Sequence, residues 1–127
     1  MSFPKELKYT RDHEWISAEA GTAKVGISSY AVEQLGDIVH VELPKEGQQF
    51  AKGDAFATVE STKTVSDVYL PAGGKIVKVN RALCENPEKL QDNPYEEWLV
   101  EIAITESSSG LFTAQAYEAF LTEDHHE

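Results

Sequence analysis

A lysine, Lys63, lies near the middle of a run of small and hydroxylated residues. Short β-prone segments, Phe56–Val59 and Val68–Leu70, flank this run. The pattern predicts a β-hairpin over about residues 56–71 with the lysine near its tip. An amine at such a tip is exposed, accessible to a modifying enzyme, and free to swing an attached group. Acylation would remove the charge of the amine and leave a neutral amide.

Other patterns do not form a convincing catalytic or metal site. His13 precedes Glu14, but no second histidine follows at the helical spacing of a zinc motif, and His125–His126 is a weak pair in the tail. Gly73–Gly74 precedes a predicted strand rather than a helix, which makes it a poor phosphate site. Cys84 has no evident partner base, and we interpret it as a small apolar residue. We therefore expect a protein that is not an enzyme and binds no metal.

Composition limits the partners and the compartment. The 127 residues include 22 acidic and 11 basic side chains, for a net charge of −11, which argues against a nucleic-acid surface. A single cysteine excludes an internal disulfide and suits a reducing compartment. No apolar stretch reaches membrane-spanning length, and the first residues resemble neither a signal nor a transit peptide. We expect a cytoplasmic protein, or a mature form that has lost a presequence.

The remaining pattern predicts one mainly β domain over residues 1–127. Turn residues recur at short intervals between β-prone segments, as in a sandwich or barrel. These segments are Lys24–Ile27, Ile38–Leu43, Lys75–Val79 and Trp98–Ile104. Two helices are expected, Ser29–Leu35 with Ser28 or Ser29 as its cap, and a C-terminal helix over about residues 113–122 capped by Thr113. Tyr117, Phe120 and Leu121 give the second helix an apolar packing face.

The segment from Val59 to Pro71, continued by Gly74 and Val79–Asn80, resembles the lipoyl-lysine region of the glycine cleavage system H proteins. Further blocks resemble the same family in the same order, so the similarity runs from Lys8 to Leu121. These blocks are Tyr9–Trp15, Val25–Ser28, Gln34–Val39 with Val41–Pro44, Asn93–Tyr95 with Trp98–Leu99, and Ala116–Glu118 with Phe120–Leu121.

The resemblance implies a lipoyl-domain-like hybrid barrel-sandwich of two antiparallel sheets, with short flanking helices and a C-terminal helix. It implies a non-catalytic carrier, expected to be a monomer, with lipoate amide-linked to Lys63. A lipoate ligase or lipoyl transferase would attach the cofactor. Glycine decarboxylase would load an aminomethyl group, aminomethyltransferase would take it, and dihydrolipoyl dehydrogenase would reoxidise the dithiol. The compartment would be the bacterial cytoplasm, or the mitochondrial matrix for a processed form.

Acidic residues around the lysine then acquire a role. Glu60 and Asp67 bracket the hairpin tip. The loaded arm ends in a cationic amine, and the resemblance assigns Glu14 and Asp67 to a cleft that holds it by charge-assisted hydrogen bonds. We expect Glu60, Asp67 and Glu14 together to form the surroundings of the arm.

This sequence departs from the family pattern at a few positions. Thr64 stands where alanine is common, and Gln91 where asparagine is usual. The segment Tyr95–Trp98 lacks a glycine and one further residue, which shortens a loop that bears on partner docking.

Four other functions stay open on the sequence. The same fold could serve as a relay that hands lipoate to 2-oxoacid dehydrogenase complexes. A biotin carrier would have methionines at Thr62 and Thr64. A lipoyl domain of a 2-oxoacid dehydrogenase would be shorter and would lack the Asp12–Trp15 block. A true enzyme would use Cys84 or a histidine, and its activity would survive Lys63→Arg.

Overall fold

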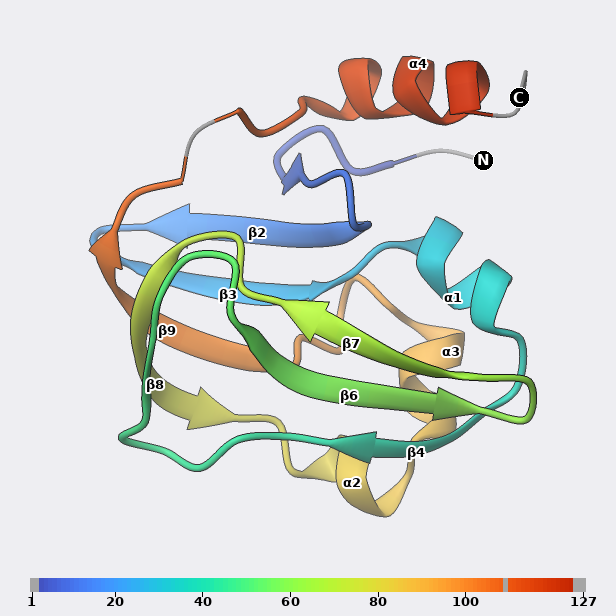
Figure 1. Ribbon diagram of the computed structural model, residues 1–127, viewed down its shortest axis with the longest axis horizontal. Coiled ribbons are helices and arrows are strands. Elements are labelled where there is room, and N and C mark those ends of the chain that lie inside the picture. The colour runs from blue at the N-terminus through green and yellow to red at the C-terminus, as the bar shows by residue number, and fades with distance from the viewer. Residues whose placement is uncertain (1–2, 109, 125–127) are drawn as a thin grey trace.

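Two antiparallel β-sheets form the framework of the fold, and residues 3–108 and 110–124 are described in this computed structural model (Figure 1). The larger sheet is ordered β1 (Lys8–Tyr9), β2 (Glu14–Glu19), β3 (Thr22–Ile27), β9 (Val100–Glu106), β8 (Gly73–Val79), β5 (Gln49–Phe50). The smaller sheet is ordered β4 (Ile38–Glu42), β6 (Ala55–Ser61), β7 (Val65–Tyr69). The predicted fold class, a mainly β hybrid of two antiparallel sheets, is confirmed, and the sheets do not close into a barrel.

The main hydrophobic core lies between the two sheets. Strand β6 shows the reason, because Val59 is fully buried while its neighbours Thr58 and Glu60 are only half-buried. The same alternation in β3 buries Val25 and exposes Lys24. Period-two patterning thus turns one face of each strand toward the core.

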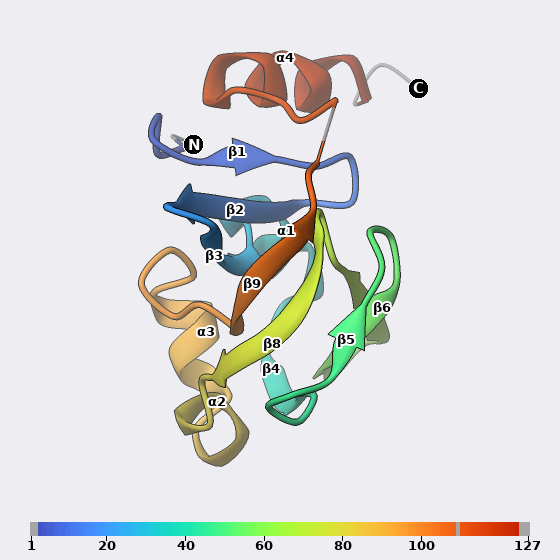
Figure 2. The same ribbon diagram turned by 90° about the vertical axis from the view of Figure 1, so that its left-hand side faces the viewer.

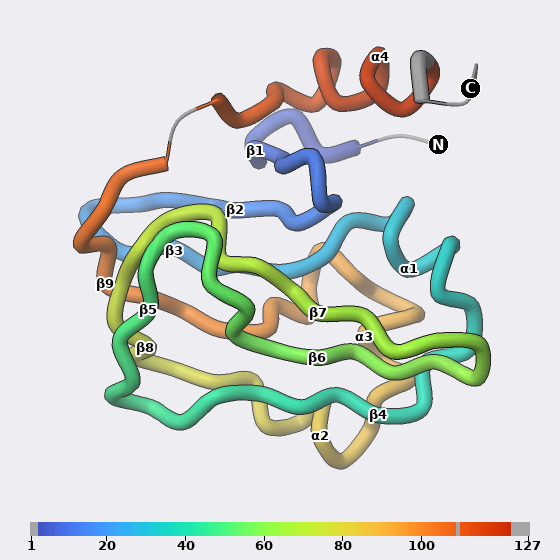
Figure 3. Tube along the Cα trace, in the orientation of Figure 1, coloured from blue at the N-terminus to red at the C-terminus, as the bar shows by residue number. Residues whose placement is uncertain are grey.

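The β6–β7 hairpin, which carries Lys63 at its tip, has longer strands and a shorter turn than the apolar segments Phe56–Val59 and Val68–Leu70 indicate. Strand β7 begins at Val65, so only Thr62, Lys63 and Thr64 separate it from β6. At the other end, the chain entering β6 and the chain leaving β7 run side by side as two arches (Figure 3). The Gly53 N–H donates to the Leu70 carbonyl at 2.8 Å, and the Leu70 N–H donates to the Asp54 carbonyl at 2.9 Å. The base of the hairpin is therefore held by backbone bonds as well.

Helix α1 (Ser29–Leu35) has the predicted bounds. The Ser28 hydroxyl accepts from the Ala31 N–H at 3.2 Å and so caps the first turn. Gly36 ends the helix with φ of +83°, a conformation that side chains disfavour. Of the two caps predicted from the sequence, Ser28 and Ser29, the structure uses Ser28.

Two short helices, α2 (Ala82–Glu85) and α3 (Glu88–Asp92), were not located by the residue pattern, although the resemblance implied short flanking helices. Neither has a side-chain N-cap bond, and the segment contains Pro87, so local signals for a helix are weak. Each helix instead buries one leucine, Leu83 or Leu90. Tertiary packing rather than propensity therefore fixes these turns.

Helix α4 (Ala114–Asp124) lies above β1 and β2 at one end of the molecule (Figure 2). The Thr113 hydroxyl accepts from the Ala116 N–H at 3.1 Å, as expected of its cap. A second, aromatic cluster fills the space beneath the helix; its buried members are Phe3, Leu7, Tyr9, Trp15, Ala114, Tyr117 and Leu121. In the described residues, no helix combines the length and apolar character needed to cross a membrane. The tail pair His125–His126 lies outside these residues.

Trp15 and Gly26 form a cross-strand pair that connects the sheet to this aromatic cluster. A Cβ built on Gly26 would lie 2.6 Å from the Trp15 ring atoms Cε2 and Cζ2. The indole is also anchored, because its Nε1–H donates to the Pro94 carbonyl at 3.0 Å. The glycine therefore provides the space into which the ring packs.

We expect Gly26→Ala to destabilise the fold by about 1–3 kcal/mol, because the anchored ring cannot move away from the added methyl group. Urea unfolding measures this as a lower midpoint with an unchanged m-value. A midpoint equal to that of the wild type would show that the ring relocates at no cost.

Candidate functional site

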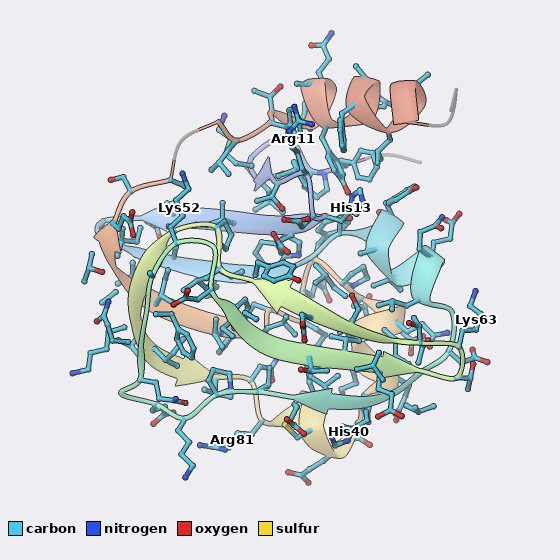
Figure 4. All side chains as sticks on the ribbon, viewed as in Figure 1. Arg11, His13, His40, Lys52, Lys63 and Arg81 are labelled. Atoms are coloured by element: carbon cyan, nitrogen blue, oxygen red, sulfur yellow. The ribbon has the colours of Figure 1, made fainter. Side chains whose placement is uncertain are left out.

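Lys63 is exposed at the tip of the β6–β7 hairpin and projects from the end of the molecule (Figure 4). The buried Ser61 hydroxyl organises the turn, accepting from the N–H groups of Lys63 and Thr64 at 3.1 Å each. The Ser61 N–H donates to the Thr64 carbonyl at 2.8 Å. An exposed side chain is thus mounted on a turn held by several hydrogen bonds. The sequence reasoning did not single out Ser61. Strand alternation, which places Ser61 on the same face of β6 as Val59, was the signal that could have found it.

The loop between α1 and β4 supports the same tip. The Thr62 N–H donates to the Asp37 carbonyl at 3.0 Å. Gln91 of α3 accepts from the Ile38 N–H at 3.0 Å and fixes that loop in turn. The stem of Lys63 passes over Gly36, where an added Cβ would lie 3.2 Å from the Lys63 Cε. The sequence marked Gln91 only as a departure from a family pattern, and its role depends on a contact 53 residues away.

A cleft of about 270 Å³ opens beside the tip and runs between the hairpin, α1 and the turn from β1 to β2. Its volume lies just below the ~300–1,000 Å³ of usual small-molecule pockets, which suits a narrow group better than a bulky ligand. The lining residues come from the three walls and the strands between them: Asp12, His13, Glu14, Ile27, Ala31, Gln34, Leu35, Val59, Thr64, Val65, Ser66, Asp67 and Val68.

Glu14 is the buried acid of this cleft, with 2 % of its surface exposed. Its carboxylate accepts from the Thr10 hydroxyl at 2.5 Å and from the Tyr69 N–H at 3.2 Å. Burial raises the pKa of Glu14 to about 7; the bonds from Thr10 and Tyr69 oppose the rise, and Asp12 adds to it. In the described part of the chain both partners of the carboxylate are neutral donors. A cation entering the cleft would therefore meet an uncompensated acid.

The other two expected acids lie differently. Asp67 is exposed on β7 and borders the cleft, as well as a hollow on the outer face of the small sheet. Glu60 does not line the cleft. It lies on β6 between buried Val59 and Ser61, so its side chain belongs to the opposite face, where it is paired across strands with His40. Glu14 and Asp67 both border the cleft, but Asp67 pairs across strands with Thr58 and so shares the outer face of the sheet with Glu60.

Residues considered for other chemistry are not assembled into a site. Cys84, interpreted as an apolar packing residue, is exposed on α2 and does not line the cleft. Within the described residues, no group of three His, Cys, Asp or Glu side chains is placed to hold a metal ion. The cleft beside Lys63 is therefore the candidate site.

Two antiparallel sheets with a lysine exposed at a hairpin tip are features shared with β-rich carrier domains. Within this class, the chain belongs to the glycine cleavage H-protein family, which it matches over residues 7–124. The family comprises carrier components of the glycine cleavage system rather than catalysts.

Individual relatives agree with this assignment. The chain is 44% identical to a glycine cleavage system H protein from Anoxybacillus flavithermus, with 98% of this chain and 100% of the relative covered. It is 48% identical to one from Bacteroides thetaiotaomicron, with coverage of 94% and 97%. The crystal structure of a glycine cleavage system H protein from Mycobacterium marinum superposes with a TM-score of 0.88 at 42% identity, covering 94% of this chain and 99% of that one.

The raised pKa of Glu14 predicts a pH-dependent stability. The folded carboxyl retains a proton that the unfolded one, with its ordinary value of 4.5, has released. The resulting stability is complete below pH 4.5 and is lost as the pH rises through about 7. Between these limits, the free energy of unfolding of the wild type should fall by roughly 3 kcal/mol relative to that of Glu14→Gln. Urea titrations of both proteins from pH 4.5 to 8 measure the difference, and parallel curves would contradict it.

Proposed function

We propose that Lys63 carries lipoate in amide linkage and that this chain is the lipoyl carrier of a glycine cleavage system. The observation that carries the proposal is the position of Lys63, exposed at a rigid tip, beside a narrow cleft that contains a buried acid. Family membership supports the cofactor and the system.

The residues present fit this cofactor. The cleft begins at Thr64, next to the proposed attachment point, so an arm on Lys63 can fold back into it. Ile27, Leu35 and the exposed Val65 line the cleft with apolar side chains that can face the hydrocarbon part of the arm. When bound, lipoate supplies a dithiolane whose disulfide opens as the aminomethyl cargo is taken up and forms again on reoxidation.

Glu14 and Asp67 are proposed to hold the cationic amine of the cargo. An ammonium group in the cleft favours the ionised form of Glu14, which lowers the pKa of its carboxyl from about 7. The charge-assisted bond that results is stronger than one between neutral groups. Asp67, at the exposed rim, adds a second carboxylate that solvent screens. The cleft walls keep water from the cargo, and the exposed rim lets it leave.

The finer assignments follow from the same role. Glycine decarboxylase would load the carrier, aminomethyltransferase would unload it, and dihydrolipoyl dehydrogenase would reoxidise it. A lipoate ligase or lipoyl transferase would modify Lys63. We place the chain in the bacterial cytoplasm, because the similar proteins named above come from bacteria. One chain contains both the lysine and the cleft, so a monomer suffices as a single carrier domain.

Lys63→Arg should leave the stability within about 0.5 kcal/mol of the wild type, because the exposed side chain contributes little to the core. Lipoylation and glycine turnover should both be lost. Intact mass and peptide mapping after co-expression with a lipoate ligase measure the first, and Lys75→Arg, also exposed, is the control. A lipoyl mass on another lysine would remove the proposal.

Glu14→Gln cannot carry a charge, and its single amide oxygen can still accept from the Tyr69 N–H while its NH2 group donates to the Thr10 hydroxyl oxygen. We expect unchanged lipoylation and a lifetime of the aminomethyl-loaded carrier shortened by about tenfold, the effect of losing a charge-assisted bond of ~1.5 kcal/mol. Rapid-quench assay of released formaldehyde and ammonia gives the lifetime. An unchanged lifetime would exclude Glu14 from holding the cargo.

A further inference from the structure

Tyr117 of α4 contacts both walls of the arm cleft with a single hydroxyl group. Its oxygen lies 2.8 Å from the Nδ1 of His13, in the turn that precedes Glu14. The same oxygen lies 2.8 Å from the Ser28 hydroxyl, the N-cap of α1. His13 lines the cleft, as do Ala31, Gln34 and Leu35 on α1. Figure 4 shows His13 beside α1 and beneath α4.

The hydroxyl network is fully consistent in its donors and acceptors. The Ser28 oxygen accepts from the Ala31 N–H at 3.2 Å, so its own proton is free to go to Tyr117. The Tyr117 proton can then go to His13. Burial raises the pKa of Tyr117, which keeps that proton on the phenol. A continuous series of hydrogen bonds thus runs from the first turn of α1 to the turn that precedes Glu14.

His13, at one end of this series of hydrogen bonds, has a strained backbone conformation. Its φ is +71°, in the left-handed region that residues with a side chain seldom occupy. The His13 carbonyl accepts from the Ser28 N–H at 2.8 Å, and its ring packs on Tyr30 of α1 at 4.7 Å between centroids. Such a conformation persists only where the surroundings enforce it, and it occurs most often at functional sites. Here it sets the direction in which Glu14 enters β2.

Tyr117 is itself held firmly in place. Tyr117 is fully buried, and its ring stacks on that of Tyr9 at 4.7 Å and 5°. Tyr9 is equally buried, but its hydroxyl donates to the Pro4 carbonyl at 2.7 Å, away from the cleft. The two tyrosines therefore share one environment while their hydroxyl groups serve different parts of the molecule.

We infer that Tyr117 is a positioning residue for the carrier function, because its hydroxyl ties together the two walls that hold the loaded arm. The inference rests on the proposed function. It assigns to α4 a role beyond covering the β1–β2 edge: through His13 and Ser28, the helix keeps the cleft narrow around Glu14.

The test compares Tyr117→Phe with Tyr9→Phe, since each removes one buried hydroxyl from the same stacked pair. In the unmodified proteins, hydrogen exchange of the Ala31 amide should be roughly fivefold faster in Tyr117→Phe than in Tyr9→Phe, the effect of one neutral hydrogen bond. In the lipoylated, aminomethyl-loaded proteins, decay should be faster by a similar factor in Tyr117→Phe alone. With a ¹³C-labelled aminomethyl carbon, its NMR line should narrow in that variant as the cargo gains mobility.

Equal exchange at Ala31, or equal decay and linewidth in the two variants, would overturn the inference. If Tyr117→Phe does not fold, His13→Asn replaces it, because asparagine tolerates the left-handed conformation but is too short to reach Tyr117. Glu14→Gln separates the two proposals. Rapid decay in Glu14→Gln with slow decay in Tyr117→Phe would refute the positioning role of Tyr117 and leave the holding role of Glu14 standing. Slow decay in Glu14→Gln would refute the holding role of the cleft. Hydrogen exchange of the Ala31 amide would then still test whether Tyr117 positions the two walls.

Discussion

The carboxylate of Glu14 belongs to β2 but accepts the Tyr69 amide of β7, so it joins the two sheets from a buried position. The rest of the site depends on this placement. Burial makes the charged form costly, and the two neutral donors recover only part of that cost. The pKa of the carboxyl is therefore raised to about 7, and a cation arriving beside it favours the ionised form.

In the proposed carrier role, exposed Lys63 provides the attachment point and buried Glu14 the charge that holds the cargo. The lysine is mounted on a turn held by Ser61 and Asp37, yet its side chain is exposed. The acid lies in a cleft whose walls are joined by buried side chains. A carrier needs both properties, because its cargo must be protected during transit and surrendered at each enzyme. Asp67 is exposed to solvent, so its proposed contribution to holding the cargo is weak.

Local chemistry made much of this predictable. The caps of α1, the hairpin and Lys63 follow from turn and strand signals within a few residues. Glu60 was expected in the cleft because it is near Lys63 in sequence, but strand alternation turns it to the other face. Tyr117 was assigned to a packing face, which it occupies, while its hydroxyl bonds to His13 over 104 residues. No local pattern encodes a contact of that kind.

Strand β7 has β6 as its neighbour on one side and the cleft on the other. An unpaired strand edge is the usual template for chain-to-chain pairing and aggregation. Here α1 and the β1–β2 turn lie beside that edge, and the Tyr69 N–H already donates to the Glu14 carboxylate. The recess beside β7 thus also obstructs pairing of this strand edge with a second copy of the chain.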